Sequence, residues 1–318
     1  MFGSTNADRI RGVGLGLVLV TALVSGVSTF VNFYAVAGTN SDAFVTVRNL
    51  ATAGLLVPVA LVAGGFSGPR LRGRDWAALA IIGLVGGAIP FLLFFHGLAL
   101  ATGAGGAATA SFVYRTLFLM ASVFGFVFLR ERISARWAIA AGLLLVGNVL
   151  LLSLVAPLWT PGTLYVLGAT LLWAAEYTLS RRVLRDLRAT TVGLGRMGFG
   201  AGFLVVYLVA TAQLGAVGAL SPGQWGWVAI SALLLAAFVA SWYAGLKRVD
   251  VGTATSVLVL GFPITLGLSL FVAGASFTVG EVAGALVVAA GVAVAIGPQG
   301  FRDTVVGLAR RAARSPPA

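Results

Sequence analysis

The sequence predicts an all-α integral membrane protein with ten transmembrane helices, arranged as two five-helix repeats of inverted topology. Three observations support this fold class. Hydrophobic residues make up 59% of the 318-residue chain and charged residues 9%, whereas a soluble domain carries about 25% charged residues. Ten apolar segments have the length that a bilayer requires. The basic residues outside these segments fall only in alternate connections.

The ten predicted spans follow one another with short connections, so we expect one compact bundle without a soluble domain. They are 13–37, 43–65, 76–99, 106–129, 137–155, 162–180, 191–213, 224–246, 251–273 and 280–296. We divide the chain into a cytoplasmic N-terminus (1–12), a first repeat (13–155), a second repeat (156–297) and a cytoplasmic basic tail (298–318). The first span also resembles a signal peptide, but its apolar run is longer than a usual h-region and the internal repeat requires it.

The positive charges predict the orientation. The basic residues outside the spans precede span one or follow spans two, four, six, eight and ten: Arg9, Arg11, Arg70, Arg72, Arg74, Arg130, Arg132, Arg136, Arg181, Arg182, Arg185, Arg188, Lys247, Arg248, Arg302, Arg310, Arg311 and Arg314. By the positive-inside rule both termini are cytoplasmic, which predicts a multi-pass protein of the cell's inner (plasma) membrane. The net charge of +12 is thus a topology signal, and nothing indicates nucleic-acid binding.

The two halves of the chain resemble each other. Arg48 falls on Arg196, and the same offset places residues 53–57 (AGLLV) on 201–205 (AGFLV). Each half has an odd number of spans, so the halves cross the membrane in opposite orientations. Inverted repeats are the architecture of secondary transporters, which bind substrate near the midplane between the repeats.

Several local patterns carry a family resemblance. They are an Arg early in spans two and seven, Leu98-Ala99-Leu100 at the end of span three, Leu129-Arg130-Glu131 after span four, Gly261-Phe262-Pro263 in span nine, and the small residues Ala140, Gly147, Gly284 and Gly291. With them the chain resembles, over about 12–296, the EamA-type ten-span members of the drug/metabolite transporter superfamily. The resemblance implies a central cavity lined by spans one, three, four, six, eight and nine, with spans five and ten peripheral. It also implies export of amino acids, other metabolites or toxic organic compounds.

Two positions depart from the family pattern. The proline usual in span four is absent, and its place lies near Phe118. The acidic residue expected after span nine falls at Ser276, while Glu281 lies about one turn further on.

Arg115 lies near the middle of span four, about 22 Å of helical rise from Arg130. A guanidinium at that depth costs at least about 2.5–3.5 kcal/mol, so it must face water, a partner or a ligand. We predict that Arg115 binds a substrate carboxylate or phosphate, the alternative being a bridge to a buried Glu or to helix carbonyls. Tyr114 is a neighbouring candidate that points about 100° away around the helix.

Glu176 in span six is the second charged candidate. It could carry a proton or bind a cation, or it could pair with Arg115, Arg196 or the cluster at Arg181. Arg48 and Arg196 lie one or two turns from a membrane edge, where snorkelling or capping of a neighbouring helix explains them. His96, near the outer end of span three, could couple protons, but a hydrogen-bonded interfacial residue is the plainer interpretation.

The remaining candidates are uncharged. Aromatic residues on spans that the resemblance turns toward the cavity suit amphipathic solutes, although Trp and Tyr also gather at membrane interfaces; they are Trp173, Tyr177, Trp242, Tyr243, Phe30 and Tyr34. Ser28 and Asn32 share one face of span one and could bond substrate or a neighbouring helix. Pro90 and Pro263 interrupt spans three and nine, either as gates or as static kinks.

No catalytic triad, Gly-rich phosphate loop or metal constellation occurs in the sequence, which contains one His and no Cys. We therefore predict neither an enzyme nor a cofactor nor a metal site. A membrane enzyme acting on lipid would need a polar catalytic cluster at one interface, which the sequence lacks. A non-transporting sensor or chaperone subunit is a further alternative, although it would usually bring an appended domain or a long tail.

We predict a secondary transporter that exports small organic metabolites by alternating access. Within the spans Arg48, Arg115 and Arg196 outnumber Glu176, which favours amino acids or other carboxylate-bearing solutes. An exporter of cationic or amphipathic drugs, such as quaternary ammonium compounds, is the alternative. The expected partners are the substrate, the lipid bilayer and a proton as the candidate coupling ion, with the chain acting as a monomer or homodimer.

Overall fold

The computed structural model describes residues 6–35, 39–63, 70–100, 103–152, 159–274 and 276–312, and every regular element within them is a helix. In chain order these are α1 (Asn6–Ala35), α2 (Ser41–Val62), α3 (Gly73–Ile82), η1 (Gly83–Ala88), α4 (Ile89–Leu100), α5 (Gly103–Arg115), α6 (Leu117–Leu129), α7 (Ala135–Leu151), α8 (Pro161–Val183), α9 (Ala189–Ala210), α10 (Gly215–Gly218), α11 (Pro222–Leu246), α12 (Val251–Leu258), α13 (Gly261–Ala273) and α14 (Val279–Ala312). The predicted all-α membrane fold is confirmed. Spans three, four and nine each consist of successive helical pieces (α3–η1–α4, α5–α6 and α12–α13), and the other seven are single helices.

Local sequence signals fix where several helices begin. α8 and α11 both start with a hydroxyl residue followed by proline, Thr160-Pro161 and Ser221-Pro222. Each hydroxyl accepts a hydrogen bond from a backbone N–H three residues on, and each proline occupies the first helical position, where no N–H is needed. Both helices therefore start at defined residues.

The helices have the surface of a membrane protein. Within the described residues, eight segments are long and apolar enough to cross a bilayer, and α7 is a shorter apolar helix of 17 residues. α8 completes the ten spans, although it carries Glu176, which is completely buried. Large apolar side chains such as Phe128, Val206 and Leu286 are exposed, as expected for helices that face lipid.

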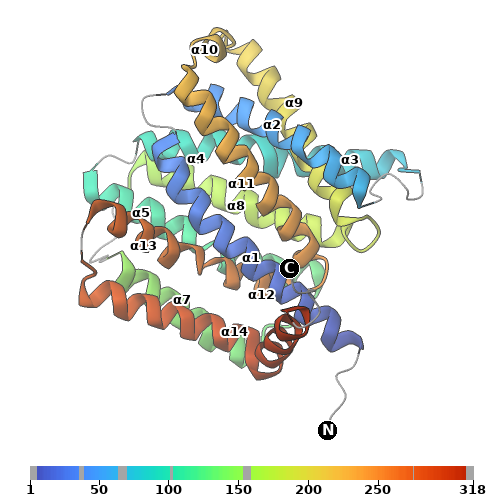
Figure 1. Cartoon of the computed structure of the whole chain (residues 1–318), viewed down its shortest axis with the longest axis vertical. Helices are drawn as coiled ribbons and strands as arrows, with labels where there is room; N and C mark the ends of the chain where they lie inside the picture. The colour runs from blue at the N-terminus through green and yellow to red at the C-terminus, as the bar shows by residue number, and fades with distance from the viewer. Residues whose placement is uncertain are drawn as a thin grey trace.

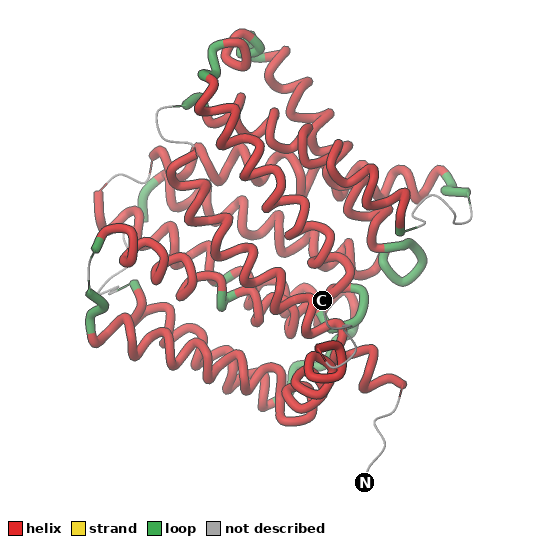
Figure 2. Tube along the Cα trace, viewed as in Figure 1, coloured by secondary structure: helices red, strands yellow, loops and turns green. Residues whose placement is uncertain are grey.

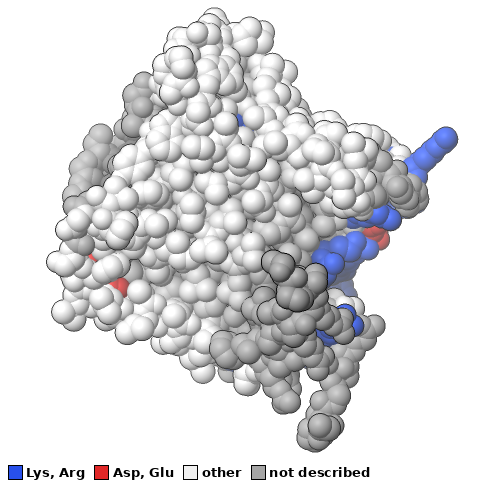
Figure 3. Space-filling view, viewed as in Figure 1, with Lys and Arg blue, Asp and Glu red and all other residues white. Residues whose placement is uncertain are grey.

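The helices lie side by side, with their connections collected at the two ends of the bundle (Figures 1 and 2). α7 and α14 pack on each other along one edge, while α2 and α9 form the opposite part of the bundle. α8 packs against η1, α4, α5 and α6 in the interior. Spans five and ten are thus peripheral, as the family resemblance implies. Figure 3 shows most of the visible Lys and Arg side chains gathered at one end of the helices, here called the basic end.

The contact between α7 and α14 depends on glycine. A Cβ atom at Gly147 would lie 2.7 Å from Val288 Cγ2 and 3.0 Å from the carbonyl oxygen of Gly284. A Cβ atom at Gly284 would in turn lie 2.8 Å from the carbonyl oxygen of Gly147. The two backbones meet where neither has a side chain, which is how small residues promote helix packing in membranes.

A Gly147→Ala substitution should therefore destabilise the protein by about 1–3 kcal/mol, because the added methyl group overpacks this contact. Gly142→Ala is the matched control on the same helix, since a Cβ atom there has no neighbour within 4 Å. The control should be neutral or stabilise by up to about 1 kcal/mol through helix propensity. Thermal unfolding of both variants in detergent tests this, and equal melting temperatures would contradict the described packing.

Candidate functional site

Spans four and nine, which correspond in the two repeats, are both interrupted near their middle. α5 ends at Arg115, and the next residue, Thr116, bonds through Oγ1 to the carbonyl of Val113 at 2.7 Å before α6 begins. In span nine, residues 259–260 separate α12 from α13, and Pro263 lies in the first turn of α13. The break in span four therefore forms without the proline that the family pattern would place nearby.

Arg115 connects the two breaks. Its guanidinium carbon lies 3.8 Å from the ring centroid of Phe262, at the start of α13, and 5.9 Å from that of Tyr114. A cation over an aromatic face is stabilised by the ring quadrupole. The charged residue at one break thus packs on the aromatic residue at the other.

A cavity of about 470 Å³, its open mouth included, lies beside these breaks. Residues of both interrupted spans and of α1, α8 and α11 line it: Ser25, Thr29, Tyr114, Arg115, Leu117, Phe118, Tyr177, Phe238, Thr255, Leu258 and Val259. Arg115 is the charged member of this set, and the others are aromatic, aliphatic or hydroxyl residues. The described lining of this central cavity thus combines apolar and hydroxyl-bearing side chains with one positive charge.

Arg115 has no carboxylate partner in the described part of the chain, where the ion pairs are Arg72–Asp75, Arg74–Asp75 and Arg196–Glu176. Its Nε atom also lacks a hydrogen-bond partner there. The side chain is half-buried and lies on the cavity wall. Its hydrogen-bonding capacity is therefore available to a bound anion.

Glu176 pairs with Arg196 in the bundle interior. Glu176 Oε2 lies 3.6 Å from Arg196 Nε, and the two residues are 0% and 2% exposed. Glu176 Oε1 accepts hydrogen bonds from the hydroxyls of Tyr243 at 2.7 Å and Ser180 at 2.5 Å. Of the three possible partners that the sequence left open for Glu176, the structure selects Arg196.

In span three, η1 is a π-helical bulge between α3 and α4, and it also contacts this network. Pro90 has no N–H to bond the carbonyl of Gly86, one turn earlier. That carbonyl accepts instead from Arg196 Nη2 at 2.9 Å and from Trp173 Nε1 at 3.1 Å. The carbonyl freed by Pro90 is occupied by side chains of two other helices, which favours a fixed kink here over a gate.

Arg48 completes the contacts around the bulge. Its Nη2 donates to Asn49 Oδ1 at 3.2 Å, and Asn49 Nδ2 donates to the carbonyl of Gly87 at 3.0 Å. Arg48 and Arg196 lie 4.9 Å and 5.9 Å from the ring centroid of Phe91. Of the two explanations offered for these arginines, snorkelling to a membrane edge is wrong, because each is 2% exposed. The other, a bond to a neighbouring helix, agrees with Arg196, which donates to the carbonyl of Gly86. Position along a helix could not show which face the side chain occupies.

Comparison with known proteins identifies the family of this chain. A model of the EamA-like transporter family matches residues 12–153 and again residues 160–297. The chain belongs to the EamA-like transporter family. One solved crystal structure, 20% identical, superposes on 89% of this chain and 97% of its own with a TM-score of 0.69, which shows a shared fold. Among curated proteins no sequence matches.

In this EamA-family protein the predicted substrate-binding residues divide into groups. Tyr114, Arg115 and Tyr177 line the central cavity. A second group lies behind that wall, buried in the interior; it comprises Trp173, Glu176, Trp242 and Tyr243. The Trp242 ring is 4.6 Å from that of Tyr177 and so supports a lining residue without reaching the cavity lining itself.

The other predicted residues lie apart from the cavity lining. Asn32 Nδ2 donates to Ser28 Oγ at 3.3 Å, and Asn32 Oδ1 accepts from Ser231 Oγ at 2.5 Å, which connects α1 to α11. His96 is exposed, and its ring is 5.2 Å from that of Tyr165. A role in substrate binding remains a prediction for every residue of the set.

Sequence reasoning missed the contacts that two residues of this EamA-family protein make. Phe262 was noted only as part of Gly261-Phe262-Pro263, yet it is the platform for Arg115. Glu131, noted only as the end of Leu129-Arg130-Glu131, accepts the backbone N–H of Val251 at 3.1 Å with each carboxylate oxygen. In both cases the family pattern contained the residue, but it did not indicate which residue of another helix the side chain would contact.

Proposed function

We propose that this EamA-family membrane protein exports small organic solutes that carry a carboxylate group, amino acids among them, by alternating access through the central cavity. The observation that carries the proposal is Arg115: a charged side chain on the cavity wall without a carboxylate partner among the described residues. A guanidinium binds a carboxylate through two parallel hydrogen bonds. The apolar walls would accommodate the rest of a small organic molecule.

The charge inside the spans supports an anionic group on the solute. Glu176 neutralises Arg196 in the interior. Arg48 bonds Asn49 and lies over the ring of Phe91, and it is not among the residues that line the cavity. One positive charge is therefore left at the cavity. A cationic drug bound there would meet that charge unshielded, which disfavours the quaternary ammonium alternative.

A set of matched solutes tests the substrate class. Binding to the purified protein and counterflow in proteoliposomes should be measured for an amino acid, its primary amide, its decarboxylated amine and a quaternary ammonium compound. We expect the amino acid to exceed both carboxylate-free analogues. Transport of the quaternary compound with no response to any carboxylate would overturn the proposal. An imposed pH gradient in the same vesicles tests a proton as the coupling ion.

The orientation is also proposed: the basic end faces the cytoplasm and both termini lie there. The chain contains no cysteine, so single cysteines can be introduced without removing any. Cysteines at Thr39, Gln213 and Gly274 should react with an impermeant reagent applied outside the cell, and cysteines at Arg72 and Arg185 should not. Labelling of the position at Arg72 from outside would contradict this topology.

A further inference from the structure

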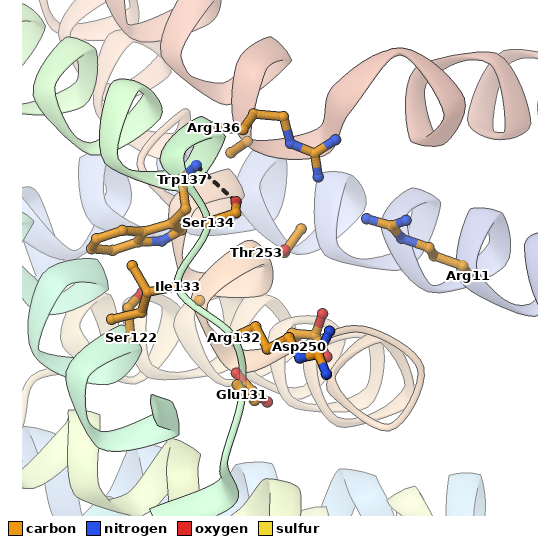
Figure 4. Close-up of a pocket in the computed structure, with 12 residues that line it drawn as sticks. Arg11, Ser122, Glu131, Arg132, Ile133, Ser134, Arg136, Trp137, Asp250 and Thr253 are labelled. Atoms are coloured by element: carbon orange, nitrogen blue, oxygen red, sulfur yellow. Dashed lines mark hydrogen bonds between the residues drawn. The ribbon is translucent and has the colours of Figure 1, made fainter. Parts of the chain in front are cut away.

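A second cavity, about 550 Å³ with its open mouth, lies at the basic end (Figure 4). We call it the basic-end cavity. Arg11 comes to it from α1, Arg132 from the connection between α6 and α7, and Arg136 from the first turn of α7. Thr253 of α12 lies between them in Figure 4, where the guanidinium groups of Arg11 and Arg136 extend toward the same space.

The basic-end cavity and the central cavity lie along the same helix contact. On α6, Phe118 lines the central cavity and Ser122 the basic-end cavity. On α12, Thr255 lines the central cavity and Gly252 the basic-end cavity. Positions three or four residues apart are separated by about 5–6 Å along a helix. About one turn of α6 and of α12 therefore separates the two spaces.

This separating turn is closely packed. A Cβ atom at Gly252 would lie 2.7 Å from Ser122 Oγ. Toward the basic end from this turn, Arg130 ends α6 in the left-handed conformation (φ 58°). Glu131, which follows it, lies against Gly125 of α6 and caps the first N–H of α12 at Val251. Burial raises the pKa of the Glu131 carboxyl, and the bond from the Val251 backbone opposes that rise. The Glu131 cap joins the first repeat to the second at the basic end.

The basic-end cavity has the charge to attract anions. Across the described residues, no ion pair involves Arg11, Arg132 or Arg136. Two carboxylates also line it, but that of Glu131 is engaged by the start of α12. The indole N–H of Trp137, another lining residue, is buried and has no hydrogen-bond partner among the residues that the structure describes. With Arg11, Arg132 and Arg136 against Glu131 and Asp250, the described lining keeps an excess of positive charge, which raises the local concentration of anions.

We propose that the basic-end cavity is the entry site at which carboxylate-bearing solutes are collected before passing between α6 and α12 to Arg115, with the Glu131 cap closing that passage. This inference rests on the proposed function for its substrate class. The geometry of the entry site does not depend on the proposed function, because the two cavities and the Glu131 cap are present whatever solute is transported.

Charge selectivity at a single cysteine tests the entry site. In a Thr253→Cys protein, methanethiosulfonate reagents bearing a sulfonate or a trimethylammonium group should be applied to the basic end. The rate at which each reagent modifies the protein is divided by its rate with free cysteine in solution. We expect the sulfonate reagent to be favoured, and the preference to fall about tenfold when Arg136→Gln is added. Arg74→Gln is the matched control, since it removes one charge from the same end at a side chain 65% exposed and outside the cavity. If Arg136→Gln and Arg74→Gln lowered the preference for the sulfonate reagent equally, the preference would come from the general surface charge of the basic end, and the entry site would be overturned.

Labelling beyond the cap tests the passage. A cysteine at Thr255 should react slowly from the basic end, and Glu131→Ala should raise that rate about tenfold, with Glu131→Gln between because its amide oxygen still accepts a hydrogen bond. An unchanged rate in both variants, each shown to be folded by its melting temperature, would overturn the role of Glu131. These assays need no substrate, so their failure is distinguishable from a failure of the solute panel.

Discussion

An Arg115→Gln variant should fold and yet bind a carboxylate-bearing solute about ten- to a hundredfold more weakly than the wild type. A hydrogen bond to a charged group contributes about 1.5–3 kcal/mol, which corresponds to that range. Arg115→Lys keeps the charge but loses the planar fork, so it should weaken binding almost as much. Binding of the primary amide should change little in either variant, since it presents no anion.

Folding should survive because Arg115 lacks an ion-pair partner in the described chain and contributes mainly its stacking on Phe262. That contact is worth about 0.5–2 kcal/mol. Arg74→Gln, at the exposed basic end, is the control for loss of a positive charge. A folded Arg115→Gln variant with wild-type affinity for the carboxylate would end the binding role of this residue.

Separating Glu176 from Arg196 should cost far more stability. Either Glu176→Gln or Arg196→Gln leaves a buried charge without its partner, and such single changes cost about 3–5 kcal/mol. Arg196→Gln also removes a donor from the carbonyl of Gly86. The double change Glu176→Gln with Arg196→Gln should recover a large part of this loss, because neither member of the pair is then left as an unpaired buried charge.

Melting temperatures of the four proteins in one detergent measure the coupling between these residues. Asp75→Asn is the matched control, because Asp75 pairs with the exposed Arg72 and Arg74. Surface pairs contribute about 0–1 kcal/mol, so the control should barely change the melting temperature. Strictly additive effects of Glu176→Gln and Arg196→Gln would contradict the interaction.

Much of the fold follows from one-dimensional patterns. Apolar length gives the spans, and the odd number of spans per half gives the inversion. The small residues at Gly147 and Gly284 stood out as a family pattern, but that they meet across α7 and α14 is known only from the structure. The interruption at Thr116 was not predictable in the same way. A proline would have marked it, whereas the bond from Thr116 Oγ1 to Val113 is one that threonine makes in many unbroken helices.

The candidate site was predictable only in part, because a helical sequence does not specify which residues of different helices meet. Depth along span four identified Arg115, which does lie on the cavity wall. Depth along span seven also suggested that Arg196 snorkels, whereas its pairing with Glu176 was one of three partners that the sequence left open and that only the structure could choose among. Pro90 was identified as a break, but the donors that occupy the freed carbonyl come from α8 and α9.

The two repeats differ in what their acidic residues do after spans four and nine. Glu131 caps α12 across the repeats, whereas Glu281 bonds Thr278, at the start of its own helix. If the halves made equivalent contacts, states open to either side would have equal free energies and equal populations. A cap worth about 0.5–2 kcal/mol on one side biases them about two- to thirtyfold toward closure at the basic end. The protein without solute would then be mostly in the state open to the far side. If it exports solutes as proposed, each cycle would begin with a thermally activated return to the state open at the basic end.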